Sequence, residues 1–149
     1  APILQAYLDK ICRVHGENHT ELFDIREQFS ASVVDLTVHM KKEESKLFPY
    51  IRKMVTAKNN HENIERPGFG IIKNPISVMI QEHDNEDHRY EKIARLTNNY
   101  ITPEDACNSY KKTFSLLQEF ENDLRKHMEL ENTILFPRAI ALDQEFIKI

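Results

Sequence analysis

The sequence contains little glycine and proline, the residues that most often mark turns. It has only three glycines and six prolines in 149 residues, and Gly68 and Gly70 fall in the same stretch. Most of the chain therefore carries no signal to turn, which favours long helices. The helical period is lost between residues 58 and 73, so a long connection is expected there.

Cysteine is also scarce. Cys12 and Cys107 are far apart and form no C-x-x-C pattern, which disfavours a disulfide framework and thiolate-bound zinc or iron–sulfur sites. Two isolated cysteines fit a protein of a reducing compartment, and the expected location is the cytoplasm. The chain opens with Ala1 and Pro2 instead of an initiator methionine, and no basic and apolar leader follows.

The sequence has neither a long apolar run nor an excess of positive charge. No uncharged apolar segment approaches the roughly 20 residues that a bilayer span needs. Twenty Lys and Arg oppose 24 Asp and Glu, so the formal net charge is −4 at pH 7, and this charge does not attract phosphate backbones. Membranes and nucleic acid are therefore disfavoured as partners, and the chain length predicts one soluble domain over residues 1–149.

Apolar residues recur at steps of three and four in several long segments, which is the period of an amphipathic helix. The predicted helices span 3–14, about 18–55, 74–99, 102 to beyond 133, and about 138–146. The expected N-caps are Asn18, Asn74 and Thr102. We therefore predict an all-α fold, an up-and-down four-helix bundle with a short extra C-terminal helix on its outside.

One polar motif occurs twice on the inner faces of the predicted helices. Residues 39–49 read HMKKEESKLFP and residues 127–137 read HMELENTILFP, so both contain H-M-x-x-E-x-x-x-L-F-P. The histidine and glutamate of each copy are four residues apart and therefore lie on one helical face. A further histidine precedes each copy on the neighbouring predicted helix, His15 before the first and His83 before the second.

These residues predict a metal centre inside the bundle. Its candidate ligands are His15, His39, Glu43, His83, His127 and Glu131. Two buried carboxylates repel each other unless positive charge lies between them. Carboxylates and imidazoles on facing helices are typical of di-iron or di-manganese centres, whereas a structural zinc site closes at four ligands and would leave groups over. Asp87, four residues after His83, is a weaker candidate.

Each part of this pattern also has a simpler explanation. A single H-x-x-x-E pair is usually an exposed ion pair on a helix. His15 stands at a helix end, where the local dipole favours a histidine without any metal. The duplication of the pair in the inner register favours metal ligation.

The combined motifs resemble the hemerythrin-like domain of the di-iron iron–sulfur cluster repair proteins, also called the repair of iron centres family. The matching segments are RVHG at 13–16, EHD at 82–84, AC at 106–107 and the two copies of the duplicated motif, the second extended to residue 139. The resemblance implies two non-haem iron ions with an oxo or hydroxo bridge. It assigns Glu43 and Glu131 as bridging ligands, and as terminal ligands the histidines His15, His39, His83 and His127.

The same resemblance implies the repair of iron–sulfur clusters damaged by nitric oxide or oxidative stress, by iron donation or by nitric oxide chemistry. Iron–sulfur proteins are then the clients, and a small diatomic molecule or oxidant is the metal-bound ligand. The alternative is a binding module that senses oxygen, nitric oxide or iron without turnover, and a purely structural bundle is a third hypothesis. Whether the protein is an enzyme or a homodimer is left open. The family places another ligand histidine upstream of His15, at a position that would precede Ala1, so the first helix is expected to lack its start.

Overall fold

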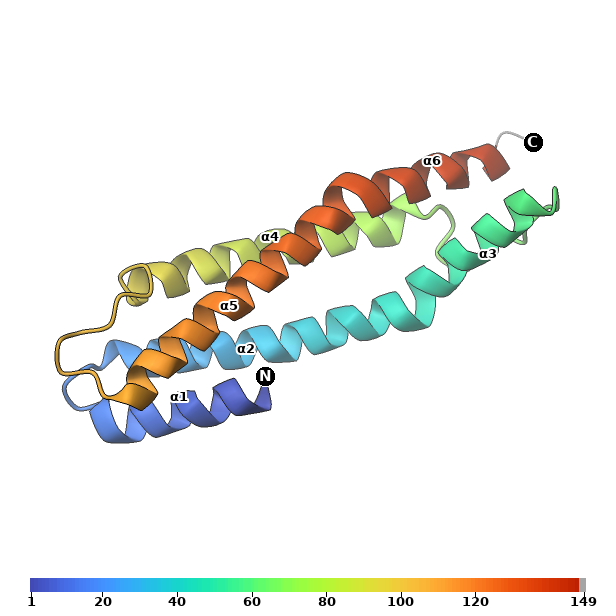
Figure 1. The fold of residues 1–149 in the computed structure, drawn as a ribbon. Coiled ribbons are helices and arrows are strands. Elements are labelled where there is room, and N and C mark those ends of the chain that lie inside the picture. The colour runs from blue at the N-terminus through green and yellow to red at the C-terminus, as the bar shows by residue number, and fades with distance from the viewer. Residues whose placement is uncertain (148–149) are drawn as a thin grey trace. The chain divides into compact units, whose positions relative to one another are not determined.

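The computed structural model describes residues 1–147, whose regular structure is entirely helical (Figure 1). The α-helices are α1 (Pro2–His15), α2 (Glu21–Lys42), α3 (Phe48–Asn59), α4 (Lys73–Leu96), α5 (Asn108–Leu130) and α6 (Phe136–Ile147). Two π-helical turns, η1 (Glu43–Leu47) and η2 (Glu131–Leu135), join α2 to α3 and α5 to α6. The predicted all-α class is confirmed. None of these described helices is both long and apolar enough to cross a membrane.

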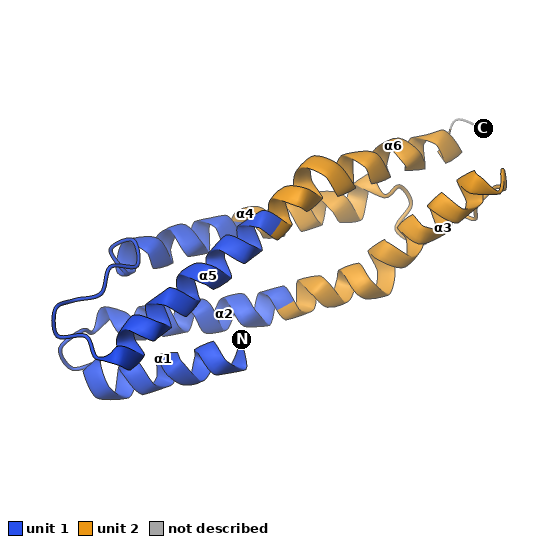
Figure 2. Cartoon of the chain, in the orientation of Figure 1, with its two compact units in different colours: residues 1–36, 85–126 blue, residues 37–84, 127–149 orange. Residues whose placement is uncertain are grey.

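The chain forms two compact units, each with its own apolar core (Figure 2). Unit 1 contains residues 1–36 and 85–126, and unit 2 contains residues 37–84 together with those from His127 onward. Each unit is thus built from segments far apart in the sequence. The single domain predicted over 1–149 stays a prediction, and its last two residues, Lys148 and Ile149, lie outside the described part of the chain.

The core of unit 1 confirms the helical stripes predicted from the sequence. Its fully buried side chains include Leu8, Ile11, Leu22, Ile25, Phe29, Tyr90, Tyr110 and Leu117. The first helix ends at His15, with Gly16 as its C-cap, as expected. Glycine is needed at this position, because a Cβ would collide with the carbonyl oxygen of Cys12 and the ring of Phe23. A larger residue would therefore force α1 away from the start of α2.

All three predicted N-caps are wrong, and one of them, Asn74, lies within α4, which begins at Lys73. The helix expected to begin after Asn18 begins at Glu21. The helix expected to begin after Thr102 begins at Asn108, because the intervening residues form a turn in which the N–H of Ala106 donates to the carbonyl of Pro103 at 3.1 Å. The carboxylate of Asp105, three residues after Thr102, contacts Nε2 of His19 at 2.9 Å.

The C-terminal helix is present, but it continues α5 through η2 and is not a separate piece on the outside. Phe136 and Ala139 of α6 are buried in the core of unit 2. Both π turns end where the L-F-P part of the motif begins a new α-helix, with Pro49 and Pro137 in its first turn. A proline is tolerated there because the first backbone N–H groups of a helix need no intrahelical acceptor.

The connection over residues 60–72 is held to unit 2 by the buried carboxylate of Asp143 in α6. This carboxylate accepts hydrogen bonds from the hydroxyl of Tyr50 at 3.2 Å, from the guanidinium of Arg66 at 3.0 Å and from the backbone N–H of Ile72 at 2.9 Å. One side chain thus holds the middle and the end of the connection to the start of α3. The sequence contains no motif that points to this role.

Replacing Asp143 with asparagine should lower the free energy of unfolding by about 2 kcal/mol, since the new amide group would face the N–H and guanidinium donors. Urea unfolding followed by circular dichroism measures this loss. The matched control is Glu145→Gln, also in α6, whose ion pair with Lys58 is exposed and should contribute less than about 0.5 kcal/mol. Equal losses in the two variants would contradict the assigned role of Asp143.

Candidate metal centre

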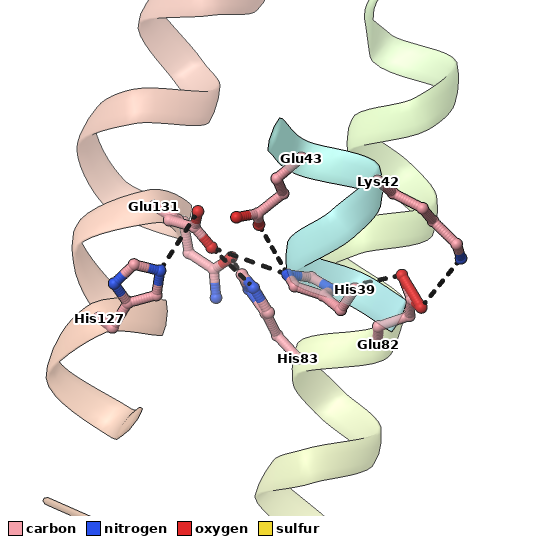
Figure 3. A network of polar contacts seen from close by, with 8 residues as sticks. His39, Lys42, Glu43, Glu82, His83, His127 and Glu131 are labelled. Atoms are coloured by element: carbon pink, nitrogen blue, oxygen red, sulfur yellow. Dashed lines mark hydrogen bonds and ion pairs between the residues drawn. The ribbon is translucent and has the colours of Figure 1, made fainter. Parts of the chain in front are cut away.

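Four of the six predicted ligands come together within unit 2 (Figure 3). They are His39 near the end of α2, Glu43 at the start of η1, His83 in α4 and Glu131 at the start of η2. All four are buried, and one ligand atom from each lies within 4.8 Å of all the others. Figure 3 shows the carboxylates of the two glutamates turned toward each other. The expected convergence of the duplicated motif therefore holds for these residues.

Each buried histidine directs Nε2 at a carboxylate. Nε2 of His39 lies 2.7 Å from Oε1 of Glu43, and Nε2 of His83 lies 3.0 Å from Oε1 of Glu131. Nε2 of His39 is also 4.0 Å from Oε1 of Glu131. The centroids of the two imidazole rings are 5.0 Å apart, so the four groups enclose one small space.

Several polar atoms in this space lack a hydrogen-bond partner among the described residues. They are Oε1 of Glu43, Nε2 of His83, and both carboxylate oxygens of Glu131. The nitrogens and oxygens lie at ion-pair distance but are not aligned as hydrogen bonds. Leaving buried carboxylate oxygens unsatisfied costs several kcal/mol, and a cation among them would remove that cost. The donor set therefore fits a bound metal.

The protein groups alone leave the site electrostatically unbalanced. Burial lowers the pKa of His39, but the carboxylates of Glu131 and Glu43 outweigh burial and raise it to about 10. Burial likewise raises the pKa of Glu131, but His39 and His83 lower it to about 2. The pKa of Glu43 is raised by burial and by the nearby carboxylate of Glu131, despite its contact with His39. The two glutamates thus compete for the same positive charge.

Both buried histidines are also held at their other ring nitrogen. Nδ1 of His39 lies 3.3 Å from Oε1 of Glu82, whose second oxygen is 3.3 Å from Nζ of Lys42 (Figure 3). Nδ1 of His83 lies 2.8 Å from Oδ1 of Asn132. Such outer partners orient histidine ligands toward a metal. Sequence reasoning gave these partners no role, although Glu82 directly precedes His83 and Asn132 directly follows Glu131.

The other two predicted ligands lie outside this buried group. His127 is at its edge, with Nε2 3.6 Å from Oε2 of Glu131 and a side chain that is 60% exposed. His15 belongs to unit 1, where its Nε2 lies 3.2 Å from Sγ of Cys107 and its ring packs against Tyr110. Ligation by His127 and His15 stays a prediction. Asp87, the weaker candidate, is also in unit 1.

The carboxylate of Asp87 lies 2.6 Å from Nη1 of Arg125. Nε of Arg125 also donates a hydrogen bond to Oε2 of Glu121 at 2.7 Å. Asp87 therefore has an ion-pair partner of its own within unit 1. This pairing is the simpler role for the carboxylate that sequence spacing had suggested as an additional ligand.

The sequence matches known proteins. Residues 2–139 match the Hemerythrin HHE cation binding domain. A protein of Yersinia pseudotuberculosis serotype IB (strain PB1/+), named Iron-sulfur cluster repair protein YtfE, is 38% identical over 140 residues, which are 93% of this chain and 57% of that protein. The protein of the same name from Yersinia pestis (strain Pestoides F) is 37% identical with the same coverage. The chain thus spans little more than half the length of these curated relatives.

Proposed function

Because the chain belongs to the hemerythrin HHE cation-binding domain family, we propose that it is a non-haem iron protein that acts in repairing iron–sulfur clusters damaged by nitric oxide or oxidants. The relatives named for cluster repair support this function. They are longer than this chain, so a repair activity of these 149 residues belongs to the proposal. Its clients would be iron–sulfur proteins of the cytoplasm. The observation that carries the proposal is the set of unsatisfied buried oxygen and nitrogen atoms on Glu43, His83 and Glu131.

The proposed iron site uses the described donors in two roles. Glu43 and Glu131 face each other and would bridge two iron ions, while His39 and His83 would each supply Nε2. His127, whose Nε2 lies 3.6 Å from Oε2 of Glu131, is proposed to extend the ligand set, and ligation by His15 stays a prediction from the sequence. Iron bound here would supply one-electron redox chemistry and open coordination positions for nitric oxide or an oxidant.

The surrounding side chains limit access of water to these donors. The ring of Phe136 stacks on His83, with centroids 5.8 Å apart and planes 13° apart. Leu47 and Met79 are buried in the same core. A low-polarity wall strengthens the interaction between carboxylates and a cation, so this packing favours retention of the metal.

Sensing without turnover is the second candidate function, and the two π turns favour it. Each turn begins at a glutamate of the site, Glu43 in η1 and Glu131 in η2, and each leads directly into α3 or α6. Single π turns are frequent at functional sites. A change in how either carboxylate holds the metal would therefore act on a helix junction, and through it on a partner surface.

Iron content is the first test of the proposal. The protein, purified and loaded with Fe²⁺ without oxygen, should retain about two iron ions per chain after desalting, as measured by mass spectrometry of the metal. A chain that retains zinc but no iron would contradict the proposal.

Cluster repair is the second test. An iron–sulfur protein whose cluster has been damaged by nitric oxide should recover its visible absorption faster with the iron-loaded chain than with the same amount of free Fe²⁺. The iron-free chain is the control. Retention of iron without any faster recovery would contradict repair and favour the sensing function.

A further inference from the structure

The two buried histidines of the proposed site are held by chemically different partners. His39 is held by a carboxylate, that of Glu82, which it shares with the ammonium group of Lys42. His83 is held by a neutral amide, that of Asn132. These partners lie outside the group of four ligand residues, so their effect on a metal would be exerted through the rings.

The contact between Asn132 and His83 is the shorter and better defined of the two. Oδ1 of Asn132 lies 2.8 Å from Nδ1 of His83, whereas the contact of His39 with Glu82 is 3.3 Å long. A carbonyl oxygen can only accept a hydrogen bond, so Nδ1 of His83 must carry a proton. In the neutral ring the lone pair is then on Nε2, which faces Oε1 of Glu131 at 3.0 Å and is the nitrogen available to a metal.

Asn132 is next to one proposed ligand, Glu131, in the sequence and contacts another, His83, in the structure. It directly follows Glu131 in η2, and its half-buried side chain reaches across to α4. Phe136, one residue beyond the end of η2, stacks on the His83 ring. The same short segment thus supplies a carboxylate donor, a hydrogen bond to Nδ1 and a stacking ring.

We propose that Asn132 is a positioning residue, which accepts the hydrogen bond of Nδ1 in His83 and so fixes the tautomer and ring orientation in which Nε2 binds the metal. This inference rests on the proposed metal binding and deepens it. The role is specific to the second copy of the duplicated motif. In the first copy the corresponding residue is Glu44, whose side chain is exposed and makes no hydrogen bond or ion pair with the described residues.

Three variants separate positioning from general packing. Asn132→Leu keeps the branching of the side chain at Cγ but removes the acceptor, Asn132→Asp keeps both shape and acceptor, and Glu44→Leu is the matched control on the other copy. The dissociation constant for Fe²⁺ is measured by competition with a coloured chelator. Loss of an outer partner typically weakens metal binding by about 10–100-fold. We expect this loss in Asn132→Leu, rescue to within about threefold of the parent protein in Asn132→Asp, and no change in Glu44→Leu.

Nitrogen NMR of the zinc-loaded protein, labelled with ¹⁵N-histidine, reads the tautomer directly. The parent protein and Asn132→Asp should show His83 protonated at Nδ1 and coordinated through Nε2, whereas Asn132→Leu should lose this single pattern. Coordination through Nδ1 in the parent protein would overturn the inference, as would parental Fe²⁺ affinity in Asn132→Leu. Failure of the proposed function is distinguishable, because the parent protein itself would then bind no Fe²⁺.

Discussion

Replacing Glu43 and Glu131 together with glutamine should abolish iron binding while leaving the helices folded. Each glutamate supplies an anionic donor within 4.8 Å of the other ligands, and glutamine keeps its shape without its charge. Removal of a direct ligand should cost more than the roughly 10–100-fold that follows loss of an outer partner, so the double variant should bind Fe²⁺ at least about a thousandfold more weakly. Chelator competition measures the loss, and circular dichroism checks the fold.

The two single variants should differ in their effect on the stability of the metal-free protein near neutral pH. The pKa of Glu131 is lowered to about 2 by the two histidines that outweigh its burial, so its ionised form stabilises the fold above the ordinary pKa of 4.5 and Glu131→Gln removes that contribution. The pKa of Glu43 is raised, chiefly by burial, so its ionised form is unfavourable at neutral pH. Glu43→Gln should therefore not lower the melting temperature.

The control for these variants is Glu44→Gln, which makes the same Glu-to-Gln change at an exposed residue next to Glu43. It should change neither iron binding nor stability. Retention of parental Fe²⁺ affinity in the double variant would show that the buried carboxylates are not ligands. The purely structural bundle would then be the better explanation of the duplicated motif.

The buried part of the site was predictable because it follows from helical periodicity. His39 and Glu43 lie in register with Leu36 and Leu47, and a residue four positions along a helix shares its face. The same argument correctly predicted that Glu131 is buried. It also predicted that His127 is buried, whereas the side chain of His127 is 60% exposed. Periodicity indicates which face a residue lies on, but it does not indicate how much of that face neighbouring helices cover.

The features that escaped prediction depend on contacts between distant segments. Asn132 contacts a histidine 49 residues away, and Asp143 contacts a backbone N–H 71 residues away. Neither contact leaves a periodic pattern in its own helix. The start of α5 was misplaced for the same reason, since Asp105, close to the predicted N-cap Thr102, contacts His19, 86 residues away.

Iron or zinc binding should release close to one proton at neutral pH, and the observed affinity should rise steeply with pH. The pKa of His39 in the folded chain, about 10 because the neighbouring carboxylates outweigh its burial, means that the ring is protonated at pH 7. A metal ion must displace this proton to reach Nε2. The observed affinity should therefore increase about tenfold per pH unit, or about a hundredfold between pH 6.5 and 8.5.

Calorimetric titration with Zn²⁺ in buffers of different ionisation enthalpy counts the protons released, and zinc avoids the oxidation of Fe²⁺ at the higher pH. The variant His39→Asn removes the titrating ring and should abolish this pH dependence along with part of the affinity. An affinity that is flat between pH 7 and 8.5 would mean that His39 is already neutral in the metal-free protein. The arrangement of Glu43, Glu82 and Glu131 around His39 would then not hold a proton as inferred.

The proton on His39 also contributes to the stability of the metal-free fold, and this contribution changes with pH in the opposite direction to metal affinity. Because the pKa of His39 is raised from its ordinary value of 6.5 to about 10, its contribution to the stability of the metal-free fold is complete below pH 6.5 and disappears as the pH rises toward 10. Metal affinity increases over the same range. The difference in melting temperature between the zinc-loaded and metal-free protein at fixed free zinc should therefore widen with pH, and a constant difference between pH 6.5 and 8.5 would contradict the linkage through His39.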